Sequence, residues 1–320
     1  MKGDTRVVDF TKCPRKNKAY GGANGNKISV IYDNDIYMLK FPPFPTRNEK
    51  LSYTNSCISE YIGCKIFEMV GIPVQKVVLG TFLVGEKNKV VVGCKDFTAN
   101  GLVLQDFASL KNQIIYSERN GYGTELSDIL NTFTEQTAID PCQLEEHFWN
   151  VFIVDAFIGN WDRHNGNWGF LYNTLTDEIE LAPIYDCGSS LYPQADETIM
   201  HKILSDRNEY NNRIYNIPLS AIHLNGKKIN YFNYISSLEN NECNKALKRL
   251  LPKINLETIN NVIDDIQCID ELQKNFYKRM LAGRKELILD FSYKKLLQKE
   301  VEKDVKNSVE KKKSEKGPRL

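Results

Sequence analysis

Apolar and polar residues in the first hundred positions are arranged in a way that predicts strands around a single helix. Residues 27–32 (KISVIY) and 36–41 (IYMLKF) are β-branched and aromatic runs joined by the turn formers Asp33–Asp35, which predicts a hairpin. Between Asn55 and Val70 the apolar residues recur every three or four positions, the period of an amphipathic helix. Residues 74–97 return to strand character. Residues 1–97 are therefore predicted to form a small lobe with an antiparallel sheet and one helix.

The pattern becomes largely helical after residue 98. Leu144–Ile158 is apolar almost all round, as in a buried core helix, and leads directly into Gly159. Two more apolar stretches, residues 254–269 and 276–289, support a helical body. We expect an α+β fold of two lobes, in which the second, residues 98–293, is larger and mainly α-helical. The cleft between two such lobes is a natural ligand site.

The end of the chain differs from the rest in charge. Residues 294–320 contain ten Lys or Arg and five Asp or Glu, a net charge of +5, whereas the whole chain has a net charge of +1. This tail is expected to be a solvated helix that frays into disorder. The remaining body is mildly acidic, which argues against a nucleic-acid partner, because such a domain carries a basic face.

Composition narrows the remaining classes of protein. In 320 residues no apolar run approaches the roughly 18–20 needed for a membrane span, and the start, MKGDTRVVDF, lacks the apolar core of a signal peptide. We expect a cytoplasmic protein, with secretion or delivery into a host cell by a signal-peptide-independent route left open. The eight cysteines form no CxxC pair and the four histidines are not paired, so any metal should be a hard cation bound by oxygen.

The most informative segment follows the buried helix. Asp162 is followed five residues later by Asn167, and Asp186 comes after a predicted hairpin and before Gly188. Phosphoryl transfer requires a carboxylate that orients the attacking hydroxyl and oxygen ligands for Mg²⁺ on the phosphates. We interpret Asp162 as the catalytic carboxylate and Asn167 and Asp186 as the metal ligands. The alternative is a polar turn, since Asn, Asp and Gly are turn formers.

Two charged residues of the first lobe fit the same chemistry. Lys40 shares a strand face with Ile36 and Met38, and Glu60 lies in the first two turns of the predicted helix. In kinases a strand lysine grips the α- and β-phosphates and pairs with a helix glutamate. Taken separately, Lys40 could be an edge-strand lysine and Glu60 a surface acid.

Several further residues are candidates for ATP binding or catalysis. The glycines of the loop before the hairpin (Gly21, Gly22 and Gly25) could bring backbone N–H groups to phosphates, although a flexible turn has the same composition. Cys94–Phe97, with Lys95 and Phe97, is predicted to be the hinge whose backbone meets adenine. His164 is either a proton shuttle or a brace for the loop, and Arg163 pairs with a phosphorylated residue or a nearby acid.

The motif Asp162-Arg-His164-Asn-Gly-Asn167, with Pro183-Ile-Tyr185-Asp186 after it, resembles the HipA-like serine/threonine kinases. Their catalytic loop has the form Asp-x-His-x-x-Asn, and their metal Asp follows Pro-x-Tyr. The resemblance covers roughly residues 18–290. It implies a bilobal kinase-like fold, ATP and Mg²⁺ as cofactors, a protein substrate with a Ser or Thr acceptor, and autophosphorylation. Candidate sites for the last are the serines and tyrosine after Asp186 (Ser189, Ser190, Tyr192 and Ser205).

Two other functions share these residues. Phosphoinositide kinases carry a loop very close to DRHNGN, so a lipid kinase is the nearest alternative. A nucleotide-binding scaffold or effector without transfer activity is disfavoured, because Lys40, Asp162, Asn167 and Asp186 are all present. No long heptad or exposed apolar stripe calls for a partner, and we expect a monomer.

Overall fold

The computed structural model describes residues 7–21, 27–42, 54–99, 101–114 and 120–314. A six-stranded sheet, in the order β1-β5-β6-β4-β3-β2, forms the first lobe. Its strands are β1 (Val8–Asp9), β2 (Arg15–Lys16), β3 (Lys27–Tyr32), β4 (Asp35–Lys40), β5 (Val77–Val84) and β6 (Lys87–Lys95), and its helix is α1 (Ser56–Met69). All pairs are antiparallel except β1 with β5.

The predicted hairpin of the first lobe is confirmed. β3 pairs with β4 from Lys27↔Lys40 to Tyr32↔Asp35, so the turn consists of Asp33 and Asn34. Both turn residues have positive φ, 50° and 63°, as the two-residue turns that suit a twisted hairpin require. Asp and Asn tolerate this conformation better than other non-glycine residues.

The second lobe is mainly helical, as predicted, but it also contains strands. Its helices are α2 (Phe107–Ile114), α3 (Leu126–Glu135), α4 (Pro141–Ile158), α5 (Glu197–Ser205), α6 (Arg207–Tyr215), α7 (Tyr231–Ser237), α8 (Asn241–Leu250), α9 (Leu256–Asp264), α10 (Glu271–Arg284) and α11 (Phe291–Ser314). Short 3-10 and π-helical segments occupy Leu251–Lys253 and Lys285–Asp290. Its strands are β7 (Leu102–Asp106), β8 (Gly169–Asn173), β9 (Glu178–Leu181), β10 (Leu219–Leu224) and β11 (Lys227–Asn230).

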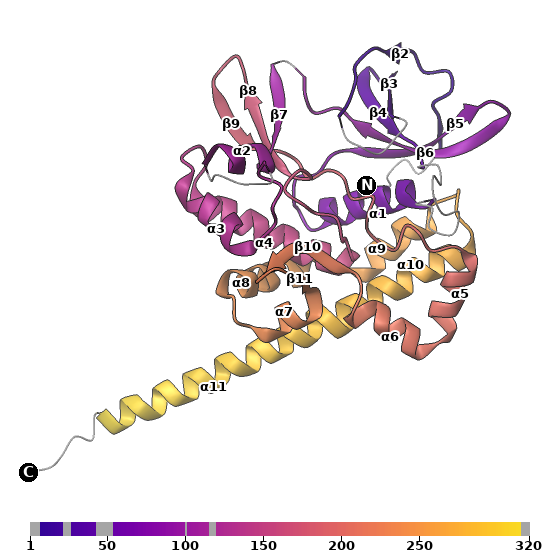
Figure 1. Cartoon of the computed structure of the whole chain (residues 1–320). Coiled ribbons are helices and arrows are strands. Elements are labelled where there is room, and N and C mark those ends of the chain that lie inside the picture. The colour runs from indigo at the N-terminus through magenta and orange to yellow at the C-terminus, as the bar shows by residue number, and fades with distance from the viewer. Residues whose placement is uncertain (1–6, 22–26, 43–53, 100, 115–119, 315–320) are drawn as a thin grey trace, which may run out of the picture.

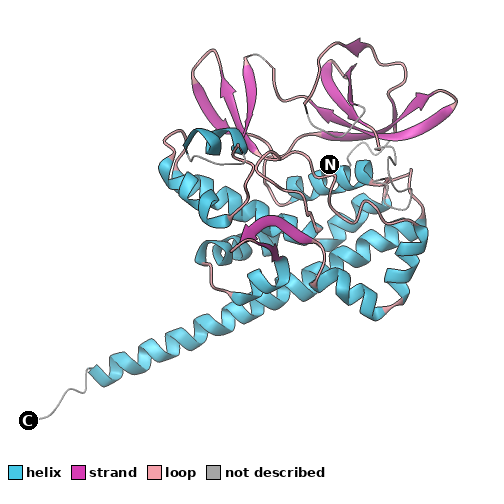
Figure 2. Cartoon of the chain, in the orientation of Figure 1, coloured by secondary structure: helices cyan, strands magenta, loops and turns pink. Residues whose placement is uncertain are grey.

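Both larger sheets lie on the same side of the helical body. Figures 1 and 2 show the six-stranded sheet beside the β7-β8-β9 sheet, with the helices below them and α11 extending away from the body. The β8–β9 hairpin was predicted, whereas β7 and the β10–β11 pair were not. Helix α1 contacts β5 and β6 as well as α4 and α9, so it joins the lobes.

Two apolar cores result from this arrangement. One face of the six-stranded sheet, α1 and the second lobe share a large core that includes Phe67, Val92, Phe157 and Leu281. The opposite face packs a smaller core around Phe10, Val30 and Leu39. Side chains alternate between the faces of a strand, so these cores also fix which polar residues face α1.

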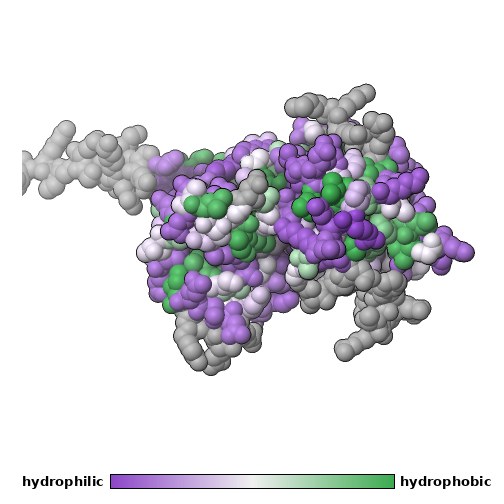
Figure 3. Space-filling view, turned by 90° about the horizontal axis from the view of Figure 1, so that it is seen from above, coloured by the Kyte–Doolittle hydropathy of each residue, from purple (hydrophilic) through white to green (hydrophobic). Residues whose placement is uncertain are grey.

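The outer surface is mixed. Seen from above the sheets, small hydrophobic areas are separated by hydrophilic ones (Figure 3). In the described part of the chain, no helix is both long and apolar enough to cross a membrane.

Candidate active site

Helix α4 leads directly into the loop that contains Asp162 and Asn167. Its first turn is capped by Asp140, whose side chain accepts hydrogen bonds from two backbone N–H groups, and it ends at Gly159 with φ of 65°. Glycine adopts this left-handed conformation without the steric cost of a Cβ atom. The next residue, Asn160, donates a side-chain hydrogen bond to Asp155 (2.9 Å) and accepts one from the backbone N–H of Asp162 (3.1 Å). The backbone of Asp162 is thereby fixed to the end of α4.

Asp162 and Asn167 are linked within this loop. The Asn167 side-chain nitrogen donates to the backbone carbonyl of Asp162 (2.7 Å), which leaves its amide oxygen for another partner. Burial raises the pKa of Asp162, and the negative charge of Asp186 adds to this, while His164 acts in the opposite direction. Asp162 is thus a carboxylate with limited hydration beside a neutral oxygen ligand.

Lys40, Glu60 and Asp186 come together although they lie far apart in the sequence. The Lys40 ammonium is 3.0 Å from Glu60 Oε2 and 3.0 Å from Asp186 Oδ1. The Glu60 side chain is 1% exposed and that of Asp186 47% exposed, so Asp186 can still reach a ligand. The Lys40 ammonium lowers the pKa of Asp186 to about 2. Burial opposes the charge of Lys40, yet Asp186 and Glu60 keep its pKa well above the ordinary value.

The backbone around Asp186 is held in an uncommon conformation. Asp186 has φ of 59°, which few non-glycine residues adopt. Gly188 lies so close to α1 that a Cβ atom there would be 3.0 Å from Glu60 Oε2. Glycine at this position therefore permits the close approach of the Asp186 segment to α1.

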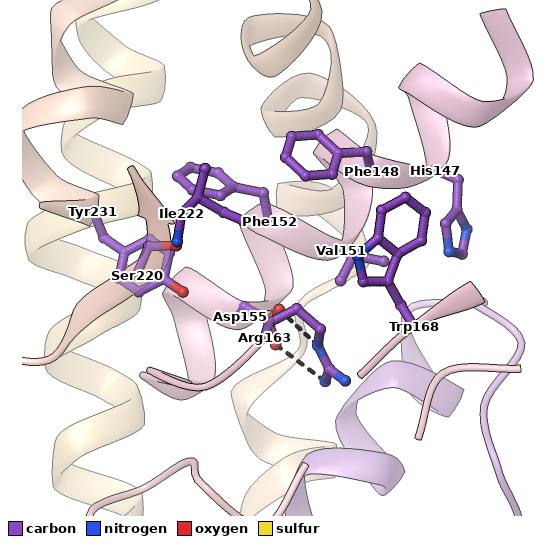
Figure 4. A pocket seen from close by; sticks show the side chains of 10 residues that line it. All are labelled: His147, Phe148, Val151, Phe152, Asp155, Arg163, Trp168, Ser220, Ile222 and Tyr231. Atoms are coloured by element: carbon purple, nitrogen blue, oxygen red, sulfur yellow. Dashed lines mark hydrogen bonds and ion pairs between the residues drawn. The ribbon is translucent and has the colours of Figure 1, made fainter. Parts of the chain in front are cut away.

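Arg163 pairs with an acid, one of the two partners expected from the sequence. Its guanidinium lies 3.0 Å from Asp155 Oδ2, donates to the backbone carbonyl of Asn167 (2.8 Å) and to that of Tyr185, and contacts Cys187 Sγ (3.3 Å). Both charged side chains are nearly fully buried, and they border a small pocket between α4 and β10 (Figure 4). Arg163 therefore ties the end of α4, the catalytic loop and the segment before Asp186 together.

His164 makes contacts that suit a brace. Its backbone N–H donates to the Asp162 carbonyl (2.8 Å), and its Nδ1 accepts from the N–H of Gly166 (3.0 Å). These bonds close the turn between Asp162 and Asn167. They favour the bracing interpretation of His164 over the proton-shuttle interpretation.

The predicted hinge and glycine loop are only partly described. Gly21 lies before β3 and accepts a hydrogen bond from Lys27 Nζ (2.8 Å), while Gly22 and Gly25 lie outside the described residues. The backbone N–H of Lys95 donates to the Lys76 carbonyl, and the Lys95 carbonyl accepts a hydrogen bond from the side-chain nitrogen of Gln75. The Lys95 ammonium pairs with Asp35. The backbone of Lys95 is thus already engaged.

Phe97 is the better placed of the two hinge candidates. Its ring lies 6.0 Å from that of Tyr185, measured between centroids, so it faces the segment that carries Asp186. We therefore interpret Phe97, rather than Lys95, as the residue that meets a nucleotide base.

Two of the candidate phosphorylation sites have hydroxyl groups that are already hydrogen-bonded in this conformation. The Ser190 hydroxyl is buried and donates to the Cys187 carbonyl (2.6 Å). The Tyr192 hydroxyl donates to the Ile217 carbonyl (2.8 Å). The segment after Asp186 is consequently built into the helical lobe.

The chain matches proteins of known type. Residues 19–266 match the model of the HipA-like C-terminal domain. The serine/threonine-protein kinase CtkA of Helicobacter pylori is 45% identical over 294 residues, which are 91% of this chain and 89% of that protein. The crystal structure of the H. pylori proinflammatory kinase CtkA aligns with a TM-score of 0.87 and 45% identity, over 92% of this chain and 98% of that chain.

A more distant structure shares the fold. It is that of the toxin–antitoxin system of Shewanella oneidensis, HipA and HipB with operator DNA. The matching chain aligns with a TM-score of 0.53 at 16% identity, over 87% of this chain and 66% of that one. The predicted bilobal α+β architecture is confirmed by these alignments.

Proposed function

This chain belongs to the HipA-like family and is a serine/threonine kinase of that type, and we propose that it transfers the γ-phosphate of Mg²⁺-bound ATP to hydroxyl groups of a protein substrate and of its own chain. The supporting observation is the contact of Lys40 with both Glu60 and Asp186 at 3.0 Å. This contact supports the proposal, because kinases use a strand lysine, a helix glutamate and a metal-binding aspartate together for phosphoryl transfer.

The residues near Asp186 suit magnesium. Mg²⁺ prefers oxygen ligands and is commonly bound by one or two protein side chains together with phosphate oxygens and water. The pKa of Asp186 is about 2, so its side chain is a carboxylate at neutral pH. The Asn167 side chain uses its nitrogen, not its oxygen, for the hydrogen bond to Asp162. When bound, Mg²⁺ would neutralise charge on the phosphates. Lys40, held by Glu60, would contact the α- and β-phosphates.

Asp162 is proposed to orient the acceptor hydroxyl and take its proton. The raised pKa of this carboxyl makes it a better base than an exposed aspartate. Phe97 is proposed to meet adenine at the hinge. Arg163 and His164 act on the geometry of the loop and are positioning residues.

The test measures transfer of radiolabelled γ-phosphate together with binding of Mg·ATP. Asp162→Asn should lower the rate about 10²- to 10⁴-fold while leaving Mg·ATP affinity near that of the wild type. Asp186→Asn should lower both. Asp265→Asn, a change at an exposed carboxylate at the end of α9, is the matched control and should lower neither.

The acceptor is tested in the same assay. A generic basic protein and phosphoinositide vesicles are offered side by side, and label is expected on protein. Label on lipid alone would contradict the protein acceptor. Normal transfer by both Asp162→Asn and Asp186→Asn would contradict the assigned site.

A further inference from the structure

Lys27 lies directly across the hairpin from Lys40. The register of β3 and β4 pairs these two residues, and directly opposite residues of an antiparallel pair project from the same face. The neighbouring Ile28 and Val30 belong to the core on the other face of the sheet. Lys27 therefore projects from the same face of the sheet as Lys40, the face on which Lys40 contacts Glu60 and Asp186.

The two lysines differ in their partners. Lys40 is matched by two carboxylates, Glu60 and Asp186. Lys27 is half-buried, donates to the neutral Gly21 carbonyl at 2.8 Å, and has no carboxylate within 4 Å among the described residues. Burial lowers its pKa, and the positive charge of Lys40 lowers it further. Asp186 and Glu60 act on Lys27 in the opposite direction but only from a distance. Within the described part of the chain, Lys27 is thus a cation of the site that no carboxylate contacts directly.

We infer that Lys27 is a second phosphate-binding lysine, which takes a terminal phosphate oxygen of the nucleoside triphosphate beside Lys40. This inference rests on the proposed function. It adds to the proposed ATP-binding residues a strand lysine that belongs to none of the sequence motifs. A polyphosphate chain bound at Lys40 would also reach the paired position and give Lys27 a direct anionic partner. The Gly21 carbonyl holds the ammonium in place until the nucleotide arrives.

A purely structural role makes a different prediction. If Lys27 only tethers Gly21, an uncharged side chain that still donates to the Gly21 carbonyl, as in Lys27→Gln, should keep the affinity for ATP. If it binds phosphate, Lys27→Gln loses affinity for ATP, and the loss depends on the phosphates of the ligand. The ratio of ATP affinity to adenosine affinity in Lys27→Gln therefore distinguishes the two roles.

The experiment uses the full chain and measures affinity for Mg·ATP directly and for adenosine by competition. Lys27→Met removes the ammonium and keeps an apolar side chain of similar length. It should weaken ATP binding about tenfold or more, as expected for a lost charge-assisted hydrogen bond, and leave adenosine affinity unchanged. Lys27→Arg keeps the charge and should recover most of the ATP affinity.

Two further variants separate the possible failures. Lys16→Met removes an exposed charge from the neighbouring strand β2 and should change neither affinity. Lys40→Met should weaken ATP binding. If Lys40→Met weakens ATP binding while Lys27→Met equals the wild type, or if Lys27→Met weakens ATP and adenosine equally, the inference is wrong and the proposed function stands. If the wild type fails to bind ATP, both are wrong.

Discussion

Arg163 is the residue on which the geometry of the catalytic loop depends most. Its guanidinium contacts Asp155 in α4, the backbone of Asn167 in the loop and the backbone of Tyr185 before Asp186. Residue spacing gave no means of choosing its partner, because Asp155 becomes a neighbour only after α4 ends in a left-handed turn. A buried ion pair of this kind fixes geometry more reliably than it adds stability.

Arg163→Met should therefore reduce both stability and activity. The uncompensated Asp155 carboxylate would remain buried, which typically costs about 3–5 kcal/mol of unfolding free energy. Urea unfolding and γ-phosphate transfer measure the two effects. In the double variant Arg163→Met with Asp155→Asn no charge is left unpaired, so stability should largely return while transfer should not. Wild-type transfer by the single variant would refute the positioning role.

His147 gives the protein a predictable response to acid. Its Nε2 atom is buried without a hydrogen-bond partner among the described residues, beside Trp168 in the pocket that Arg163 also lines (Figure 4). Burial, and then the charge of Arg163, lowers the pKa of His147 from 6.5 to about 4. The folded state thus favours the neutral ring. Above about pH 6.5 the ring is neutral in both the folded and the unfolded state and costs no stability. Below that pH only the unfolded chain takes up the proton, so the folded state loses stability until its own pKa is reached.

We predict that the stability of the wild type falls more steeply in acid than that of His147→Gln. Between pH 7.5 and pH 5 the histidine should account for about 2 kcal/mol of lost unfolding free energy, and the loss should level off below about pH 4. Urea unfolding at the two pH values measures the difference. His201→Gln changes an exposed histidine of α5 and serves as the control. Equal pH dependence in all three proteins would contradict the prediction.

Among the elements that hold the site, helix α1 is under a close steric constraint where it faces the segment after Asp186. It presents Glu60 to Lys40 on one turn and Gly63 to the segment after Asp186 on the next. A Cβ atom at Gly63 would lie 2.8 Å from the Cβ atom of Cys187, closer than real side chains approach. The helix can therefore hold Glu60 in place only while position 63 has no side chain.

Gly63→Ala separates helix propensity from packing. Alanine favours a helix by up to about 1 kcal/mol over glycine, so the isolated helix should gain stability. The contact with Cys187 should nevertheless push α1 away, weaken the Lys40–Glu60 pair and reduce Mg·ATP affinity. Adding Cys187→Gly removes the opposing atom and should restore the affinity. Undiminished binding by Gly63→Ala alone would show that α1 tolerates the shift.

The sequence correctly predicted those elements whose signal lies within the element itself. The β3–β4 hairpin, α1 and α4 were read correctly from turn residues and from hydrophobic periods of two or about 3.6. Strand β7 was missed because it is a single short strand that pairs with β8 across more than sixty residues of sequence. The Lys40–Glu60 pair was predicted from the strand and the helix that carry the two residues, whereas the role proposed for Lys27 depends on a strand register that composition does not reveal.

On the scale of the whole molecule, the C-terminal helix sets the limit of the second lobe. The sequence placed the boundary after residue 293, but α11 begins at Phe291 and continues to pack against the body beyond that point. Leu296 is 5% exposed, Lys295 donates to the Ser236 carbonyl, and Glu300 pairs with Lys248. Val301 and Val305, which follow Leu296 by five and nine residues, are 62% and 57% exposed.

A chain that ends at Lys306 should therefore fold and transfer phosphate like the full chain, with an unfolding free energy within about 0.5 kcal/mol. A chain that ends at Tyr293 loses the buried Leu296 side chain, worth about 1.5–3 kcal/mol, together with the Lys248–Glu300 contact. Urea unfolding of the three chains tests the boundary, and Leu296→Ala in the full chain separates the packing of this side chain from the loss of helix. Val301→Ala is the matched change on the exposed part of α11 and should be nearly neutral. Equal stability of the chains ending at 293 and 306 would place the boundary where the sequence predicted it, and would mean that α11 contributes nothing to the kinase body.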